Sequence, residues 1–234
     1  MNRNFFSGGN AMDRRRFINS SLATGAAIAG FTPDVIAESD RSVRIVGLSC
    51  SPRKGKTTAA SIRAALEAAK QVDSRVRTEL IDLGGLTFSG WKGAGKTEKD
   101  DFDRLVLPKL RDPVPDGMII GSPVYFRNAS SLCMAFLERL GVLRKPTLLL
   151  ADTVVGALSV GAYRNGGQEL VIQQIQAAML CHEAFLVGGK PGAHQGATLW
   201  NAYEDDIMKD EFGIDSARKL GVRVAEAALL KKQA

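Results

Sequence analysis

The residues best suited to chemistry lie between positions 49 and 58, where an apolar segment runs into a turn rich in hydroxyl and basic side chains. The hydroxyl donors are Ser49, Ser51, Thr57 and Thr58, and the cations are Arg53, Lys54 and Lys56. The next residues, 57–71, form a predicted helix, whose free N–H groups and dipole favour an anion at the same turn. The pattern therefore predicts a binding site for a phosphate group.

Two other unusual turns follow apolar segments of strand character, at residues 121–128 and 161–167. Apolar, turn-bounded segments predict five strands, which alternate with helical segments; the strands are expected near residues 43–49, 76–83, 116–120, 154–160 and 185–187. Strands alternating with helices indicate an α/β fold with a parallel, doubly wound sheet and helices on both faces. Ligands bind beyond the carboxyl ends of such strands, so the three turns are expected to converge on one ligand.

The composition fits one globular domain and excludes several classes of site. The chain has 234 residues, 45% of them hydrophobic, with 31 Lys and Arg against 25 Asp and Glu. This mild excess, with no basic stripe or interleaved aromatics, disfavours nucleic acid as a partner. Cys50, Cys133 and Cys181 are far apart and are expected to be buried small hydrophobes, so no metal site is predicted.

The first 37 residues have the character of a leader. Arg14, Arg15 and Arg16 precede an uncharged segment, residues 19–31, and small residues follow where a signal peptidase cleaves, so the pattern resembles a twin-arginine export signal. The apolar segment is too short for a permanent membrane anchor. We therefore expect residues 1–37 to direct export to the periplasm and residues 38–234 to form the domain. A basic tail on a cytoplasmic protein is the alternative, and either Met1 or Met12 is the start.

Three segments, in this order and spacing, resemble the NADPH-dependent FMN reductase-like proteins, close to their iron–sulfur flavoprotein branch. Residues 51–58, Ser-Pro-Arg-Lys-Gly-Lys-Thr-Thr, are similar to the family's phosphate loop, with Thr57 where Asn is frequent. Residues 121–126, Gly-Ser-Pro-Val-Tyr-Phe, match the segment that borders the flavin ring, and residues 161–169 look like the loop at the pyrimidine end of that ring. The likeness covers about residues 43–231 and implies a flavodoxin-like fold.

The resemblance implies that FMN is the cofactor and names the residues that bind it. They are Ser51, Arg53, Lys54, Lys56, Thr57, Thr58, Ser122, Pro123, Val124, Tyr125, Phe126, Tyr163, Arg164, Gly166 and Gly167. Backbone N–H groups of Gly166 and Gly167, with the charge of Arg164, are expected to face the flavin N1–C2=O edge, where negative charge develops on reduction. Tyr125 or Phe126 is expected to form an apolar wall, with ordinary packing as the alternative. No catalytic side chain is assigned.

The chain departs from the iron–sulfur branch in one respect. That branch carries a compact group of cysteines in the region that corresponds to residues 88–100, and this chain has none there. Because a [4Fe–4S] cluster needs thiolate ligands, we predict no iron–sulfur cluster. The flavin alone is then expected to carry the electrons.

The resemblance implies an FMN-dependent oxidoreductase that passes electrons to a small molecule or protein, with NAD(P)H as a possible donor. If the chain is exported it lacks an NADPH supply, so a protein or quinol donor is the alternative. Relatives are commonly dimers or tetramers, which predicts a homo-oligomer. The physiological donor and acceptor are left open, as is a role for His194 in a Gly-rich loop after the last strand, where it could reach over the flavin.

Three other functions compete with this interpretation. Residues 90–97, Gly-Trp-Lys-Gly-Ala-Gly-Lys-Thr, fit the Walker A pattern of nucleotide hydrolases, and residues 148–152 resemble its partner strand. A Walker A loop must follow a strand directly, however, and Gly84 and Gly85 break the strand before it. The second competing function is a flavin electron carrier without enzyme activity, and the third is a binding module with a vacant site.

Overall fold

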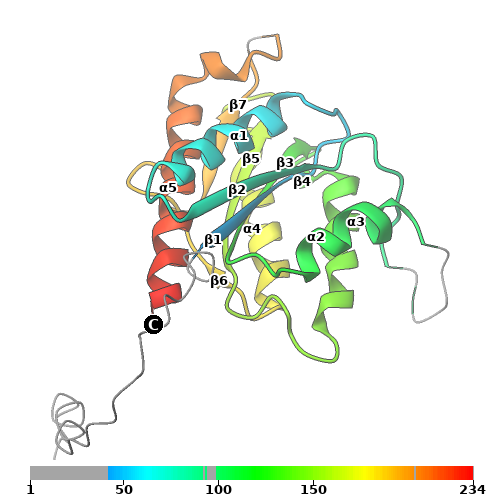
Figure 1. Cartoon of the computed structure of the whole chain (residues 1–234). Helices are drawn as coiled ribbons and strands as arrows, with labels where there is room; N and C mark the ends of the chain where they lie inside the picture. The colour runs from blue at the N-terminus through cyan, green and yellow to red at the C-terminus, as the bar shows by residue number, and fades with distance from the viewer. Residues whose placement is uncertain (1–41, 92, 94–98, 203, 234) are drawn as a thin grey trace, which may run out of the picture. The chain divides into compact units, whose positions relative to one another are not determined.

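The structure, a computed structural model, describes residues 42–91, 93, 99–202 and 204–233. Its centre is a mainly parallel sheet in the order β2-β1-β3-β5, followed by β6 and β7, which both pair with β5 (Figure 1). The long strands are β1 (Val43–Ser49), β2 (Val76–Asp82), β3 (Gly117–Tyr125) and β5 (Val154–Gly161). This is the strand order of flavodoxin-like sheets, so the predicted fold class is confirmed.

Three short strands explain why the described sheet has seven strands where the sequence predicts five. They are β4 (Asn128–Ala129), β6 (Phe185–Leu186) and β7 (Ala197–Trp200). β6 pairs with the start of β5 and β7 with its end, so the two share one edge position in the sheet. Residues 187–196 leave the sheet between β6 and β7. The two strands therefore do not form one continuous apolar segment in the sequence, and β7 is not predicted.

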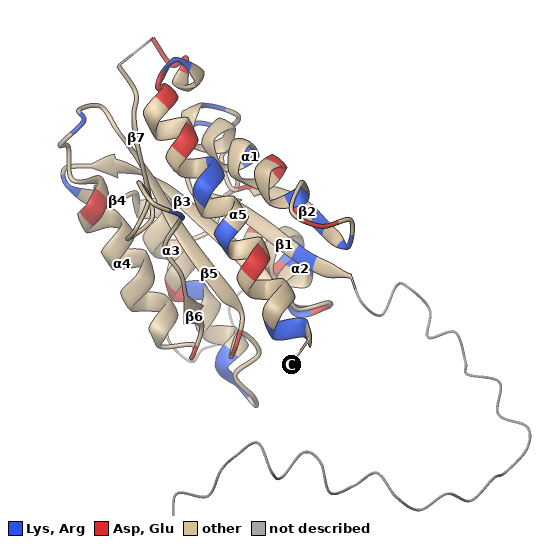
Figure 2. Ribbon diagram, turned by 90° about the vertical axis from the view of Figure 1, so that its left-hand side faces the viewer, with Lys and Arg blue, Asp and Glu red and all other residues tan. Residues whose placement is uncertain are grey.

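Helices cover both faces of the sheet (Figure 1). One core cluster joins the sheet to α1 (Thr57–Lys70) and α5 (Glu211–Gln233). The other joins it to a π-helical turn (Phe102–Val106) that continues into α2 (Leu107–Arg111), and to α3 (Ser131–Arg139) and α4 (Gln168–Leu180). Short 3₁₀ helices cover Leu140–Arg144 and Ile207–Lys209. Acidic residues gather near the start of α5 and basic residues become more frequent toward its end (Figure 2).

The strands have glycine where α1 and α5 pack most closely against the sheet. A Cβ atom at Gly47 of β1 would overlap Ile62 of α1, and one at Gly156 of β5 would lie 2.8 Å from Val224 of α5. Because both faces of the sheet are covered, β1 and β5 are buried almost throughout. Glycine at these two positions lets α1 and α5 pack directly against the strands.

Two element boundaries differ from the sequence prediction near the 121–128 turn. β3 does not end at Ile120 but continues to Tyr125, because residues 121–123 pair with β5 and residues 124–125 pair with β4. Asn is a typical helix cap, so the sequence predicts Asn128 as the cap of the helix after this turn; the cap of α3 is instead Ser130, whose Oγ accepts a hydrogen bond from the Cys133 N–H. The sequence also predicts a final helix from about residue 215 to residue 231, and α5 begins four residues earlier, at Glu211.

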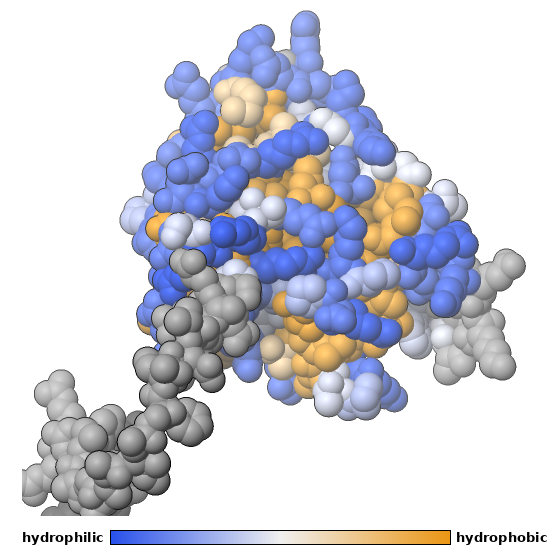
Figure 3. All heavy atoms as spheres, in the orientation of Figure 1, coloured by the Kyte–Doolittle hydropathy of each residue, from blue (hydrophilic) through white to orange (hydrophobic). Residues whose placement is uncertain are grey.

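The sequence places Leu132, Phe136, Leu137 and Leu140 on one helix face, which is expected to be core or, alternatively, a subunit interface. Phe136, Leu137 and Leu140 are buried, as are Cys50 and Cys133, whereas Cys181 is exposed and so is not the buried hydrophobe that the sequence predicts. On the face of the domain drawn in Figure 3, hydrophobic residues are visible between hydrophilic ones. Along the described chain, none of the helices combines the length and apolarity needed to cross a membrane.

His182, expected at a helix end as a cation or a core residue, follows α4 and is 4% exposed. Its Nδ1 atom has no hydrogen-bond partner among the described residues. Burial, and secondly the charge of Arg144, hold the pKa of His182 below its usual value. His182 is therefore a core residue whose protonated form the fold disfavours.

We predict that His182 makes the protein less stable in mild acid. Its pKa is lower in the folded chain than in the unfolded chain, so the unfolded chain binds the proton more readily and stability falls as the pH drops below about 6.5. Urea unfolding at several pH values should show a shallower loss of stability in His182→Gln than in the native chain. The exposed His194 provides the control variant His194→Gln; equal slopes in all three proteins would contradict the prediction.

Candidate functional site

The three unusual turns lie at the carboxyl ends of three neighbouring parallel strands. β3 pairs with β1 on one side and with β5 on the other, so residues 49–58 and 161–167 and the hairpin that ends β3, residues 121–128, lie at the same end of the sheet (Figure 1). The three segments are therefore neighbours, and their convergence on one ligand stays a prediction. What they bind is a separate question, which their chemistry addresses.

Ser130 fastens the first loop to the second. Its Oγ donates to the Cys50 carbonyl oxygen at 2.6 Å and accepts from the Cys133 N–H at 3.0 Å. Its own N–H donates to Ser122 Oγ at 3.0 Å, and Ser122 Oγ donates to the Pro123 carbonyl oxygen. The Ser122 hydroxyl, expected from the resemblance to contact the cofactor, is therefore buried, and its proton is already donated within the protein. We call the three loops at this end of the sheet the rim.

The second and third loops also touch. A Cβ atom at Gly167 would lie 3.2 Å from the Arg127 Cα atom, and Gly167 has a φ of +110°, a conformation that glycine adopts most easily. Gly167 precedes the first residue of α4 and has no side chain to cap it. A glycine is thus required where the two loops meet.

The first loop has the features of an anion site. Lys56 precedes α1 without a side-chain cap, so the first N–H groups of this 14-residue helix stay open. Ser49 Oγ and Thr58 Oγ1 are buried without a hydrogen-bond partner in the described chain. An unpaired buried hydroxyl costs about 1–3 kcal/mol, so a ligand oxygen that accepts from it would stabilise the loop.

Asp82, at the end of β2, holds this loop in place. Its carboxylate accepts from the Gly55 N–H at 2.7 Å and from the Gly84 N–H at 3.1 Å. A Cβ atom at Gly84 would lie 2.6 Å from the backbone of Lys54, so the turn after β2 packs directly on the loop. Asp82 is a strand-end carboxylate with a structural role, as the sequence predicts.

The basic residues of the loop are partly paired. Arg53 Nη1 donates to both carboxylate oxygens of Asp205, at 2.8 and 2.9 Å, and Lys56 Nζ lies 4.0 Å from the same carboxylate. Hydrogen bonds from Asn201 and then Arg53 hold the pKa of Asp205 below its usual value. Sequence reasoning missed Asp205 because it lies 152 residues from Arg53 in an irregular segment.

The second loop projects an aromatic side chain into solvent. Phe126 and Arg127 form the tip of the β3–β4 hairpin with φ values of +50° and +64°, which strain residues other than glycine. Phe126 is 99% exposed and Tyr125 is 40% exposed. The alternative that Phe126 packs in the core is therefore wrong. Pro123 and Val124 belong to the last residues of β3.

The third loop corrects one expected donor. The Gly166 N–H donates to Tyr163 O at 3.1 Å and to Gln168 Oε1 at 2.8 Å, so it is not free for a ligand. The Gly167 N–H has no hydrogen bond to any described residue and remains a donor. Tyr163 is 76% exposed at the tip of the loop.

Arg164 does not supply an unpaired charge, contrary to the sequence prediction. Its Nη2 donates to Asp210 Oδ1 at 2.6 Å, and its guanidinium lies over the rings of Trp200 and Phe212. Asp210 is buried and also accepts from the Trp200 N–H at 2.7 Å. Arg164 therefore anchors the third loop to α5 and β7.

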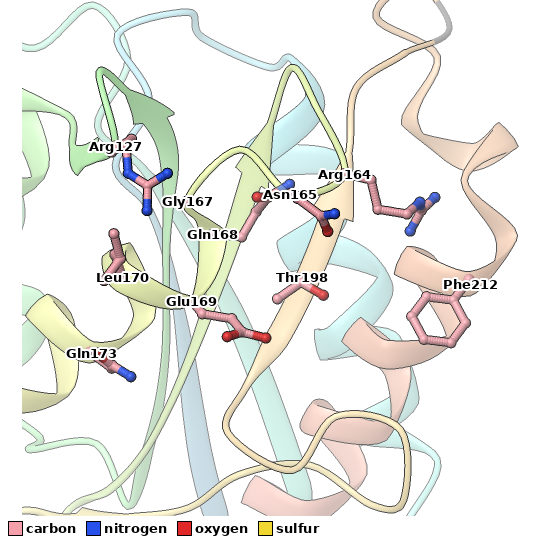
Figure 4. A pocket seen from close by; sticks show the side chains of 10 residues that line it. All are labelled: Arg127, Arg164, Asn165, Gly167, Gln168, Glu169, Leu170, Gln173, Thr198 and Phe212. Carbon is pink, nitrogen blue, oxygen red and sulfur yellow. The ribbon is translucent and has the colours of Figure 1, made fainter.

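A cavity of about 550 Å³ lies on the outer side of the third loop (Figure 4). Arg164 and Phe212 line one end, and Arg127 and Leu170 lie at the other. Loop 187–196, which contains His194, hydrogen-bonds to α4 through Gln195 and to α5 through Lys190. This loop therefore lies along the sheet edge beside β7.

The Walker-like segment does not have the setting of a phosphate loop. Residues 83–90 are irregular, so no strand leads into it, and residues 148–152 form turns. Residues 92 and 94–97 of the motif are outside the described residues, as is the leader. The nearby chain is anchored by buried Arg139, which pairs with Asp100 and Asp103. In the described part of the chain, His, Cys, Asp and Glu form no group suited to a metal ion.

Comparison with known proteins decides the family. The family model described as NADPH-dependent FMN reductase matches residues 43–198. The chain belongs to this family. It is 36% identical over 199 residues to an iron–sulfur flavoprotein of Methanocaldococcus jannaschii, covering 82% of this chain and 100% of that protein. It is 34% identical over 184 residues to an iron–sulfur flavoprotein of Methanosarcina thermophila, covering 76% of this chain and 93% of the relative.

A shorter match, 36% identical over 81 residues, is to an NAD(P)H dehydrogenase (quinone) of Cupriavidus metallidurans, and covers 35% of this chain and 40% of that protein. Among solved structures, RosB with a bound riboflavin-phosphate intermediate has a TM-score of 0.67 at 16% identity, over 82% of this chain and 81% of that chain. A flavodoxin, WrbA-like protein of Agrobacterium tumefaciens has a TM-score of 0.54 at 19% identity, over 80% and 97%. These structures share the fold of this family member.

We predict that Ser130→Ala loosens the junction between the first two loops. The variant loses an α3 cap and a buried hydrogen bond to Cys50, at a cost of about 2 kcal/mol. Urea unfolding should show this loss in the free energy of unfolding, whereas Ser131→Ala, at the exposed neighbouring position, should change it by less than about 0.5 kcal/mol. Equal stability of the two variants would contradict the proposed role of Ser130.

Proposed function

We propose that the chain is an FMN-dependent oxidoreductase whose three-loop rim binds the cofactor. Membership of the NADPH-dependent FMN reductase family supports a flavin oxidoreductase in general. The observation that carries the assignment of the site is the uncapped start of α1 beside the unpartnered hydroxyl of Thr58. A phosphate there would accept from the helix N–H groups and that hydroxyl, so the residues present fit the phosphate end of FMN.

The remaining rim residues fit the ring end of the cofactor. Pro123, Val124 and Tyr125 form the end of β3, and Gly167, whose N–H has no hydrogen bond to a described residue, lies just before α4. When bound, FMN would supply the redox chemistry by accepting a hydride and passing electrons on. The chain would position the ring and supply the Gly167 N–H as a fixed donor near developing negative charge. No side chain of the rim needs to transfer a proton.

Electrons are proposed to pass through the flavin alone. Although several relatives are named iron–sulfur flavoproteins, the sequence has three cysteines in total and none between residues 88 and 100. Cys50 and Cys133 are buried, and burial, then contact with Cys133, raises the pKa of the Cys50 thiol. A protonated, buried thiol is a poor metal ligand.

The donor and acceptor are proposed by chemical class. NAD(P)H as donor and a quinone or other small molecule as acceptor fit the names of the family and of the quinone-reducing relative. If the leader directs export, as its sequence suggests, a protein or quinol donor replaces NADPH. We also propose that the active form is a homo-oligomer, a dimer or tetramer.

A flavin electron carrier is the second candidate. It is favoured by the same rim and by the exposed aromatics Phe126 and Tyr163, which a protein partner would cover. Redox titration separates the two functions, because a carrier shows two resolved one-electron steps whereas a two-electron reductase shows one combined step.

One purification tests the proposed function and the location together. An absorption spectrum and an iron assay of protein isolated from separated periplasmic and cytoplasmic fractions should show bound flavin without iron, in the periplasmic fraction. Colourless protein that also fails to take up added FMN would contradict the function. Flavin-loaded protein confined to the cytoplasm would contradict export alone, and iron with acid-labile sulfide would contradict the flavin-only proposal.

We predict that Thr58→Val weakens FMN binding and leaves riboflavin binding unchanged. Valine keeps the packing of the buried side chain but removes the hydroxyl, and a hydrogen bond to a charged group contributes about 1.5–3 kcal/mol, or roughly tenfold or more in affinity. Quenching of flavin fluorescence measures both ligands. Thr78→Val in β2 is the matched control; equal losses for FMN and riboflavin would place Thr58 away from the phosphate.

A further inference from the structure

The carboxylate of Asp205 occupies the basic side of the proposed phosphate site. Arg53 donates to both of its oxygens at 2.8 and 2.9 Å, and Lys56 lies 4.0 Å away. Asn201 Nδ2 also donates to Asp205 Oδ1, at 2.9 Å, so the carboxylate has a second partner besides Arg53. An anion of the protein itself is therefore held against the cations that the ligand phosphate would meet.

The segment that carries Asp205 is strained and anchored. Glu204 and Asp205 have φ values of +48° and +68°, which residues other than glycine rarely adopt. The Asn201 N–H donates to the Gly161 carbonyl oxygen at 2.8 Å, which fixes the start of the segment at the end of β5. The contact with Arg53 is therefore made by a segment that Asn201 ties to the end of β5.

We infer that Asp205 is a specificity-determining residue: its carboxylate competes with the anionic group of the ligand for Arg53. This inference rests on the proposed FMN site. A ligand with a single negative charge gains little by replacing a carboxylate that is already in place. A phosphate monoester carries nearly two charges and more acceptor oxygens, so Arg53, Lys56 and the start of α1 favour it over Asp205. The site therefore selects phosphate monoesters.

If Asp205 competes with the ligand, removing it has the opposite effect on affinity from removing a residue that supports binding. When the Arg53–Asp205 pair has to break before the phosphate binds Arg53, removal of Asp205 strengthens binding, because less of the protein is in the paired state that excludes the phosphate. If Asp205 instead orients Arg53 in the complex, its removal weakens binding. Asp206 provides the matched control, since Asp206→Asn removes the same charge one residue further on and, among the described residues, disturbs an ion pair with Lys209 at 3.5 Å and not the contact with Arg53.

The first test compares FMN and riboflavin on flavin-depleted full-length protein by fluorescence quenching. Asp205→Asn should bind FMN about three- to tenfold tighter than the native chain, with riboflavin affinity unchanged. Asp206→Asn should match the native chain for both ligands, and Asp205→Asn should have no further effect in an Arg53→Gln background. Weaker or unchanged FMN binding, or the same gain for riboflavin, would overturn the inference.

The second test uses inorganic phosphate and needs no flavin. Phosphate should raise the melting temperature of Asp205→Asn more than that of the native chain or Asp206→Asn, each compared with its own ligand-free value. Equal shifts would overturn the inference. Failure of every variant to bind either flavin would overturn the proposed function. The melting-temperature shifts with phosphate would then show by themselves whether Asp205 competes with phosphate for Arg53.

Discussion

The pairing of β3 between β1 and β5 is the constraint on which the site depends. Parallel pairing in this register places the carboxyl ends of three strands side by side, and with them three loops that are far apart in the sequence. Ser130 links the first two loops by hydrogen bonds. Its hydroxyl connects the end of β1 to the start of α3, and its N–H donates to Ser122. Gly167 completes the rim by letting the third loop approach Arg127.

The basic side chains of the three loops are already paired within the protein. Two arginines that could attract a phosphate or a flavin form ion pairs with aspartates from the last third of the chain, Arg53 with Asp205 and Arg164 with Asp210. The two pairs differ in burial, since the Asp210 side chain is 1% exposed and that of Asp205 is 31% exposed. A buried carboxylate with several partners holds its arginine permanently, whereas a more exposed one can exchange. The rim thus combines one fixed arginine with one arginine that a ligand can compete for.

The sequence predicts the parts of this structure that depend on local pattern. Apolar runs and turn residues place the long strands, and the edge at which ligands bind follows from their parallel order. The partners of the polar groups could not be predicted where they lie far apart in the sequence: Arg164 donates to Asp210, and Ser130 donates to the Cys50 carbonyl oxygen. The Gly166 N–H donates to Gln168, only two residues away, through a side-chain orientation that the pattern does not specify. The pattern does not predict β7, because the chain leaves the sheet for residues 187–196 and returns beside the same strand.

Hydrogen–deuterium exchange with and without FMN reports on all three loops in one measurement. We expect FMN to slow backbone exchange in residues 49–58, 121–128 and 161–167 together, and ATP to leave it unchanged. Protection confined to one of these loops, or found only around the Walker-like residues 90–97, would contradict a shared flavin site at the carboxyl ends of β1, β3 and β5.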